Sequence, residues 1–133
     1  MKPDDRAILI QLRLTQASET LHESQVLIEQ NSPRGAINRA YYAMFYALQA
    51  LALQKQQPVS KHTGILSFFD REFVKTGIFE PSFSRAIHAA FEQRQKSDYR
   101  ETSQPSFDMA KNTFNDAKNF VKAVSDYLTQ SLV

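Results

Sequence analysis

The chain has 133 residues, a length that suits one domain with a core of its own. Hydrophobic residues make up 42% and charged residues 23%, as in ordinary globular proteins, so the composition excludes a disordered chain. A formal net charge of +2 neither requires nor excludes a nucleic-acid partner, and the absence of cysteine excludes disulfides and thiolate metal sites.

Internal prolines divide the chain into periodic segments, and they are Pro33, Pro58, Pro81 and Pro105. Proline is excluded from helix interiors but favoured in first turns, and glycine often ends a helix, as Gly77 is expected to do. The resulting segments are predicted helices over residues 4–30, 33–55, 60–75, 82–102 and 106–130.

Apolar residues recur in steps of three and four along these segments, which is typical of helices that bury one face. In the last segment the stripe consists of Phe107, Ala110, Phe114, Ala117, Val121, Val124 and Leu128. We therefore expect an all-α, up-and-down bundle of four long helices, with a short fifth helix over 60–75 in a crossover. A single domain is expected to cover residues 1–133.

The longest uncharged stretch, residues 40–54, is shorter than the roughly 18 residues that predict a membrane span. The N-terminal residues lack the apolar region and cleavage site of a secretory signal. These features predict a cytoplasmic protein without a membrane partner.

The second helix carries Arg39, Tyr42 and Tyr46 on one flank, at steps of three and four. One interpretation is a solvated face, or aromatic side chains that a neighbouring helix covers. The other is a contact surface for a partner or ligand, because Tyr and Arg supply large, preorganised contact area. The pattern alone leaves both open.

Residues 94–99 read RQKSDY, and Arg94 continues an apolar stripe that includes Phe83, Ile87 and Phe91. Arg94 and Asp98 are i,i+4 neighbours on the helix and can pair. The pair could be structural, with Tyr99 closing over it. Alternatively, Asp98 orients a partly buried Arg94 whose planar fork binds phosphate.

The histidines His22, His62 and His88 lie in three different predicted helices without metal-binding spacing. We expect no metal site and no cofactor. A surface or capping role is expected for His62, and His88 is expected to flank the core stripe.

Two segments together resemble the HEPN domain (higher eukaryotes and prokaryotes nucleotide-binding), in particular its small stand-alone prokaryotic branch. They are residues 37–47, INRAYYAMFYA, and residues 94–99, with KHTGI at 61–65 between them. The resemblance covers residues 10–128. It implies a bundle of four or five helices and a homodimer in which the fourth helices meet at a cleft.

The resemblance also implies a function, because many HEPN proteins are toxins encoded beside a minimal nucleotidyltransferase that serves as antitoxin. Active members are metal-independent endoribonucleases with an Arg, a polar residue, a spacer and a His. Arg94 and Gln95 match the first two positions, and Tyr99 stands where the His is expected. A phenol is a weak acid–base group near neutral pH.

The resemblance thus implies that Arg94, Asp98 and Tyr99 form the catalytic or binding motif, and that Arg39, Arg94 and Gln95 contact the phosphates of RNA. Tyr42 and Tyr46 are the expected interface or cleft residues. Tyr99 is also a candidate AMP acceptor, because some of these antitoxins adenylylate a tyrosine near the motif.

The leading hypothesis is therefore a HEPN toxin that binds RNA and cleaves it if the motif is active. The first alternative is a non-catalytic subunit that binds nucleotide or presents substrate to a nucleotidyltransferase, and the missing motif histidine favours it. The second alternative is a structural bundle without a ligand.

Overall fold

The computed structural model describes residues 1–58, 61–98 and 104–132, and these are almost entirely helical, with no strand among them. The predicted all-α class is confirmed. The elements are α1 (Pro3–Glu29), α2 (Pro33–Gln54), α3 (His62–Phe69), the π-helix η1 (Asp70–Val74), α4 (Pro81–Asp98) and α5 (Phe107–Leu132).

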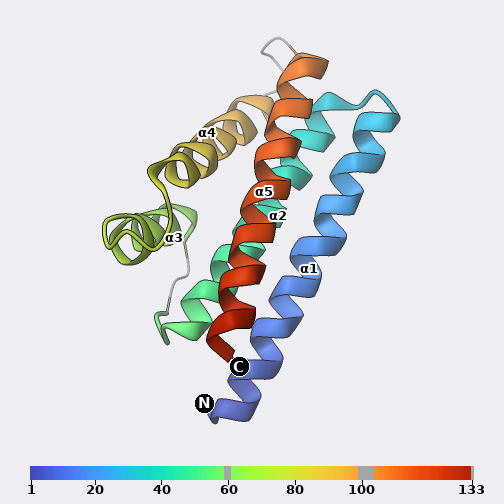
Figure 1. The fold of residues 1–133 in the computed structure, drawn as a ribbon. Coiled ribbons are helices and arrows are strands. Elements are labelled where there is room, and N and C mark those ends of the chain that lie inside the picture. Colours follow the sequence, from blue (N-terminus) through green and yellow to red (C-terminus); the bar gives the residue numbers. More distant parts are fainter. Residues whose placement is uncertain (59–60, 99–103, 133) are drawn as a thin grey trace.

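The bundle is organised around α2, which contacts each of the other four α-helices. In Figure 1, α1, α2 and α5 run side by side as long rods, while α3 and α4 lie together on the other side of α2. The N-terminus and the end of α5 lie at the same end of the bundle. This arrangement confirms the predicted bundle of four long helices with a short fifth one.

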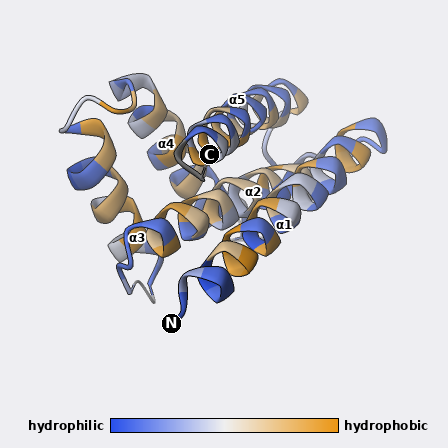
Figure 2. Cartoon of the chain, turned by 60° about the horizontal axis from the view of Figure 1, so that its bottom comes forward, coloured by the Kyte–Doolittle hydropathy of each residue, from blue (hydrophilic) through white to orange (hydrophobic). Residues whose placement is uncertain are grey.

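Alanine residues allow α2 to lie at the centre of the bundle. Four alanines of α2 have no exposed surface: Ala40, Ala43, Ala47 and Ala50. They recur at intervals of three and four residues, so their small side chains face the neighbouring helices. Because small side chains let helix axes approach closely, the other helices can pack tightly around α2. Figure 2 shows the hydrophobic faces of the helices turned inward and hydrophilic residues along the outer faces.

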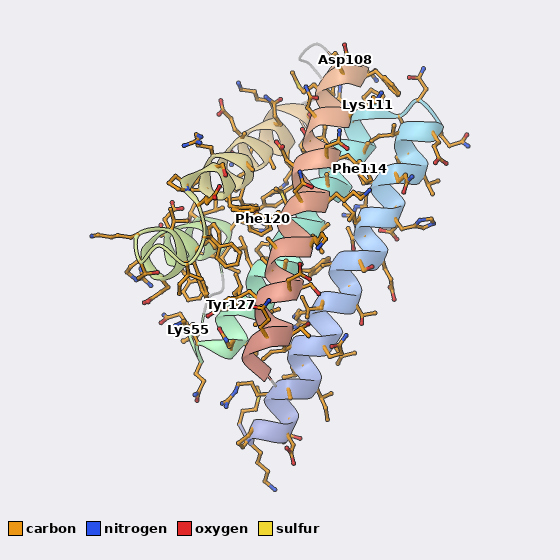
Figure 3. The ribbon with its side chains drawn as sticks, viewed as in Figure 1. Lys55, Asp108, Lys111, Phe114, Phe120 and Tyr127 are labelled. Atoms are coloured by element: carbon orange, nitrogen blue, oxygen red, sulfur yellow. The ribbon has the colours of Figure 1, made fainter. Side chains whose placement is uncertain are left out.

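A cluster of aromatic rings attaches the α3–η1 segment to α5. Phe69 and Phe73 are fully buried, and they contact Phe120 at 5.3 Å and Tyr127 at 5.6 Å between ring centroids, respectively. Figure 3 shows Phe120 and Tyr127 on the side of α5 that faces α3. Such edge-to-face and tilted pairs add to the burial of the rings themselves.

The third helix differs from its prediction over 60–75. The α-helix covers only His62–Phe69 and continues as a π-helix, in which the Lys75 N–H donates to the Asp70 carbonyl at 2.8 Å. A π-turn accommodates one extra residue per hydrogen-bonded turn, and apolar spacing does not reveal it. Gly77 follows at φ +82°, so the predicted glycine stop is confirmed.

The other helix limits lie within a few residues of their predictions, apart from α4. The described part of α4 ends at Asp98, so the rest of the predicted helix over 82–102 lies outside the described residues. No helix of the described residues is long and apolar enough to cross a membrane.

Two helices end in the same hydrogen-bonded motif. After α1, Asn31 adopts φ 57° and the Ser32 N–H donates to the Leu27 carbonyl at 2.8 Å. After α2, Gln56 adopts φ 55° and the Gln57 N–H donates to the Ala52 carbonyl at 2.9 Å. This is the Schellman pattern, whose left-handed residue is normally glycine.

Replacing Gln56 by glycine should therefore stabilise the fold. The left-handed conformation destabilises a residue with a Cβ by about 1–2 kcal/mol, and glycine avoids this cost. The greater freedom of glycine in the unfolded chain offsets part of the resulting gain in stability. We expect Gln56→Gly to raise the free energy of unfolding by about 0.5–1 kcal/mol in urea denaturation. The same exchange at exposed Gln11, inside α1, should lower it by about 1 kcal/mol. A loss of stability in Gln56→Gly would contradict the assignment.

Candidate functional site

Charged and aromatic side chains from three helices meet on one side of α2. Tyr41 and Tyr42 come from α2, His62 from the start of α3, and Arg94 and Asp98 from the last turns of α4. We call these five residues the Arg94 cluster. Both α3 and α4 contact α2, and this packing brings together residues that are more than fifty positions apart in the chain.

Arg94 lies against both tyrosines. Its guanidinium carbon is 5.4 Å from each ring centroid, a distance at which the ring quadrupole attracts a cation. The Nε atom is enclosed without a hydrogen bond, and it lies 3.4 Å from Asp98 Oδ2, close enough for an ion pair but not for a well-formed hydrogen bond. The Arg94 side chain keeps 21% of its surface exposed. The predicted i,i+4 pair thus forms, and it holds a cation at the edge of the core.

The hydroxyl of Tyr41 is bound to the imidazole of His62. The Tyr41 oxygen and His62 Nδ1 are 2.6 Å apart, and Tyr41 has no exposed surface. Burial raises the pKa of Tyr41 well above its usual value, and the charge of Arg94 opposes part of this rise. The phenol therefore stays protonated near neutral pH and can donate to the imidazole.

His62 does not have the surface or capping role expected for it, and that prediction is wrong. The ring is partly buried and stacks on Phe45 at 4.3 Å with an interplanar angle of 16°. Desolvation by burial lowers the pKa of His62 below 6.5, and the charge of Arg94 lowers it further. The spacing of His62, Leu66 and Phe69 was the missed signal, because residues at i, i+4 and i+7 share one helix face.

Arg39 approaches the same cluster from an earlier turn of α2. Its guanidinium carbon lies 5.1 Å from the Tyr42 ring centroid, and the side chain donates to Asn38 Oδ1 at 2.8 Å and faces Glu23 at 3.7 Å. Arg39 and Arg94 therefore both contact Tyr42. The common role of the two arginines in binding phosphate stays a prediction.

The flank of α2 is largely covered. Tyr42 and Tyr46 are partly buried and pack against the core, with ring centroids 6.3 Å apart. Of the two interpretations left open, neighbouring aromatic side chains account for most of this surface, and the partly exposed rings remain available to a ligand.

The remaining predicted site residues are less informative. Gln95 is exposed and lies next to Arg94 on α4. Tyr99, predicted both as a motif residue and as an AMP acceptor, lies outside the described residues. His88 is exposed and contacts Asp70 Oδ2 at 2.7 Å, so it ties α4 to η1.

Metal ligands do not gather in the described part of the chain, where no group of three His, Asp or Glu side chains could hold an ion. One hollow of about 460 Å³ lies between the end of α4 and the start of α5 and not at the Arg94 cluster. Its lining includes Gln93, Lys96, Ser97 and Met109. The side chains of Arg94 and Asp98 keep 21% and 46% of their surface exposed, so the Arg94 cluster is partly exposed.

Comparison with known proteins assigns the chain to a family. The family model of the HEPN domain matches residues 10–127 of the chain. A protein of Thermotoga maritima named "UPF0332 protein" is 33% identical over 91% of this chain and 92% of its own length. Two proteins of Methanocaldococcus jannaschii, each named "Putative toxin", are 33% identical over 92% of this chain and 91% of theirs, and 30% identical over 86% and 78%.

The fold, the extent of the family match and these relatives agree with the resemblance that residues 37–47 and 94–99 carry, and the chain belongs to the HEPN domain family.

Proposed function

We propose that this HEPN protein is the toxin-like member of a toxin–antitoxin pair, that it binds RNA, and that a minimal nucleotidyltransferase is its antitoxin. The names of the two relatives from M. jannaschii support the toxin-like role. The family resemblance motivates the RNA ligand and the nucleotidyltransferase partner.

The placement of Arg94 is the observation that supports this proposal most. A guanidinium at the edge of a core loses hydration, and a phosphate restores both charge neutrality and hydrogen bonds. Asp98 offers only partial compensation, because its oxygen stands 3.4 Å from Nε. The rings of Tyr41 and Tyr42 hold the guanidinium of Arg94 in place, so little conformational entropy is lost when a phosphate binds.

The neighbouring residues have defined parts in this proposal. Asp98 orients Arg94, and Arg39 supplies a second positive charge beside Tyr42. Gln95 offers an exposed amide to the sugar–phosphate backbone. Tyr46 is partly exposed, and a base of single-stranded RNA could stack on its ring.

A homodimer in which two fourth helices meet would place two such clusters along one RNA strand. Tyr99 occupies the position at which the family motif has a histidine, so the site favours binding of RNA over its cleavage. AMP on Tyr99, five positions after Arg94 in the chain, would add negative charge to the motif and would oppose binding of the phosphates of RNA.

Helix α4 provides a matched pair of arginines for a binding test. Arg94→Ala should weaken binding of a fluorescein-labelled single-stranded RNA by roughly 10- to 100-fold, because a charged hydrogen-bonding partner of phosphate is removed. In anisotropy titrations, the slope of log affinity against log salt should become shallower by about 0.7 for each phosphate that the variant no longer neutralises. Arg85→Ala removes an exposed arginine from the same helix and should change affinity far less. Equal effects of the two variants would refute a specific site at Arg94.

Toxicity is tested by inducible expression in a bacterial host. The wild-type chain should slow growth, Arg94→Ala should relieve that effect at equal protein levels, and co-expression of the nucleotidyltransferase encoded beside it should restore growth. If the wild type neither slows growth nor binds RNA, and Arg94→Ala behaves identically, the toxin-like role is excluded.

The alternative, a nucleotide-binding or scaffold subunit, is favoured by the absence of the motif histidine. A single guanidinium beside aromatic rings also suits one nucleotide. Calorimetry with ATP and GTP separates the two functions, because tight binding of a mononucleotide without affinity for RNA would support the alternative.

A further inference from the structure

His62 is the one histidine of the Arg94 cluster, and the family motif gives it no part. Its Nδ1 atom is engaged with Tyr41, whereas no hydrogen bond to Nε2 is found among the described residues. The ring is held on three sides, by stacking on Phe45, by the edge of Tyr42 and by Tyr41. A ring fixed in this way presents its second nitrogen in a defined direction.

The hydrogen bond to Tyr41 determines which nitrogen carries the proton. The buried phenol is neutral and has one hydrogen to donate, and Arg94 beside it offers only donors. His62 Nδ1, at 2.6 Å, is therefore the acceptor that satisfies the phenol. A neutral imidazole that accepts at Nδ1 carries its hydrogen on Nε2, so His62 has an N–H donor that no described residue engages.

This N–H group belongs to the same site as Arg94. The His62 ring lies 5.5 Å from the Tyr41 ring and 5.8 Å from the Tyr42 ring, and the guanidinium of Arg94 contacts the same two rings at 5.4 Å. The charge of Arg94 also contributes to the lowered pKa of His62, after the larger effect of burial. Two donors from two helices thus flank one pair of tyrosines.

We propose that Arg94 and His62 together bind one phosphodiester group of RNA, with the guanidinium contacting one non-bridging oxygen and the neutral His62 Nε2–H donating to the other. Tyr41 is the positioning residue that fixes the imidazole and its tautomer. This inference rests on the proposed RNA binding at Arg94 and extends it to a residue from α3 that lies outside the family motif.

In the free protein the surroundings of His62 favour its neutral form over its protonated form. Protonation of His62 would place a charge beside Arg94 and would leave the buried Tyr41 hydroxyl without an acceptor. Among the described residues, the charged or titratable groups that face His62 are Tyr41 and Tyr42 from α2 and Arg94 from α4, which Asp98 partly neutralises. Near pH 7 His62 therefore adds a hydrogen-bond donor to the site without adding a charge.

Two substitutions separate the two nitrogens of His62. His62→Asn keeps an acceptor near Nδ1 for Tyr41 but has nothing at Nε2, whereas His62→Gln extends an amide N–H to the position of Nε2. Titrated with the same labelled single-stranded RNA at pH 7.5, His62→Asn should bind roughly tenfold more weakly than the wild type. His62→Gln should recover most of that loss, and thermal melts of both variants control for folding.

The outcomes distinguish this inference from the proposed function. Loss of affinity in Arg94→Ala and His62→Asn, with recovery in His62→Gln, supports both. If Arg94→Ala weakens binding but His62→Asn binds like the wild type, or if His62→Gln is as weak as His62→Asn, the role of Nε2 is refuted while RNA binding at Arg94 stands. If Arg94→Ala also binds like the wild type, the proposed function fails first.

The tautomer is tested without any ligand by NMR of the ¹⁵N-labelled protein. Near pH 7, His62 should show a protonated Nε2 and an unprotonated Nδ1, and it should titrate below 6.5 because burial and Arg94 disfavour its charged form. In Tyr41→Phe the titration should move upward, because a hydrogen bond that stabilises the neutral ring is removed. A proton on Nδ1 of the wild-type protein would overturn the inference even if a histidine variant failed to fold.

Affinity should also depend on pH in a defined direction. Protonation of His62 adds positive charge beside the bound phosphate, so RNA affinity should rise as the pH falls through the pKa of His62, below 6.5. This rise should be smaller in His62→Gln, which has no titratable group at this position.

Discussion

The buried hydroxyl of Tyr41 is the constraint on which the site depends. A phenol without exposed surface must find a hydrogen-bond partner inside the protein, since an unpaired one costs several kcal/mol. His62 supplies that partner from another helix at 2.6 Å. This hydrogen bond ties the start of α3 to α2, and together with the stack on Phe45 it orients the partly buried imidazole.

The same rings that enclose the phenol also support a cation. Arg94 lies on Tyr41 and Tyr42, and Arg39 reaches Tyr42 from an earlier turn. Aromatic faces stabilise guanidinium groups without neutralising them, unlike carboxylates. Asp98 and Glu23 lie 3.4 Å and 3.7 Å from the two guanidinium groups, too far for well-formed hydrogen bonds, so both cations are only partly neutralised.

Membership in the HEPN family and the geometry of the cluster bear on different parts of the function. The family and the names of its relatives support a toxin-like role, whereas the distances around Arg94 concern how a phosphate would be held. Tyr99 in the motif weakens the case for RNA cleavage by acid–base chemistry. His62 from α3 belongs to the same Arg94 cluster. In our proposal its hydrogen bond to Tyr41 leaves the proton on Nε2, so the ring acts as a hydrogen-bond donor to a ligand and not as a base.

The sequence by itself determined the class of the fold, the number of helices and most of their limits, because apolar periodicity and proline placement are local signals. It also predicted the Arg94–Asp98 pair, since i,i+4 neighbours meet on any helix. Only the tertiary structure showed the π-turn at Asp70–Val74 and the entry of His62 into the cluster. Contacts between residues more than twenty positions apart depend on how helices pack, and a single sequence records the faces that pack but not which helices meet.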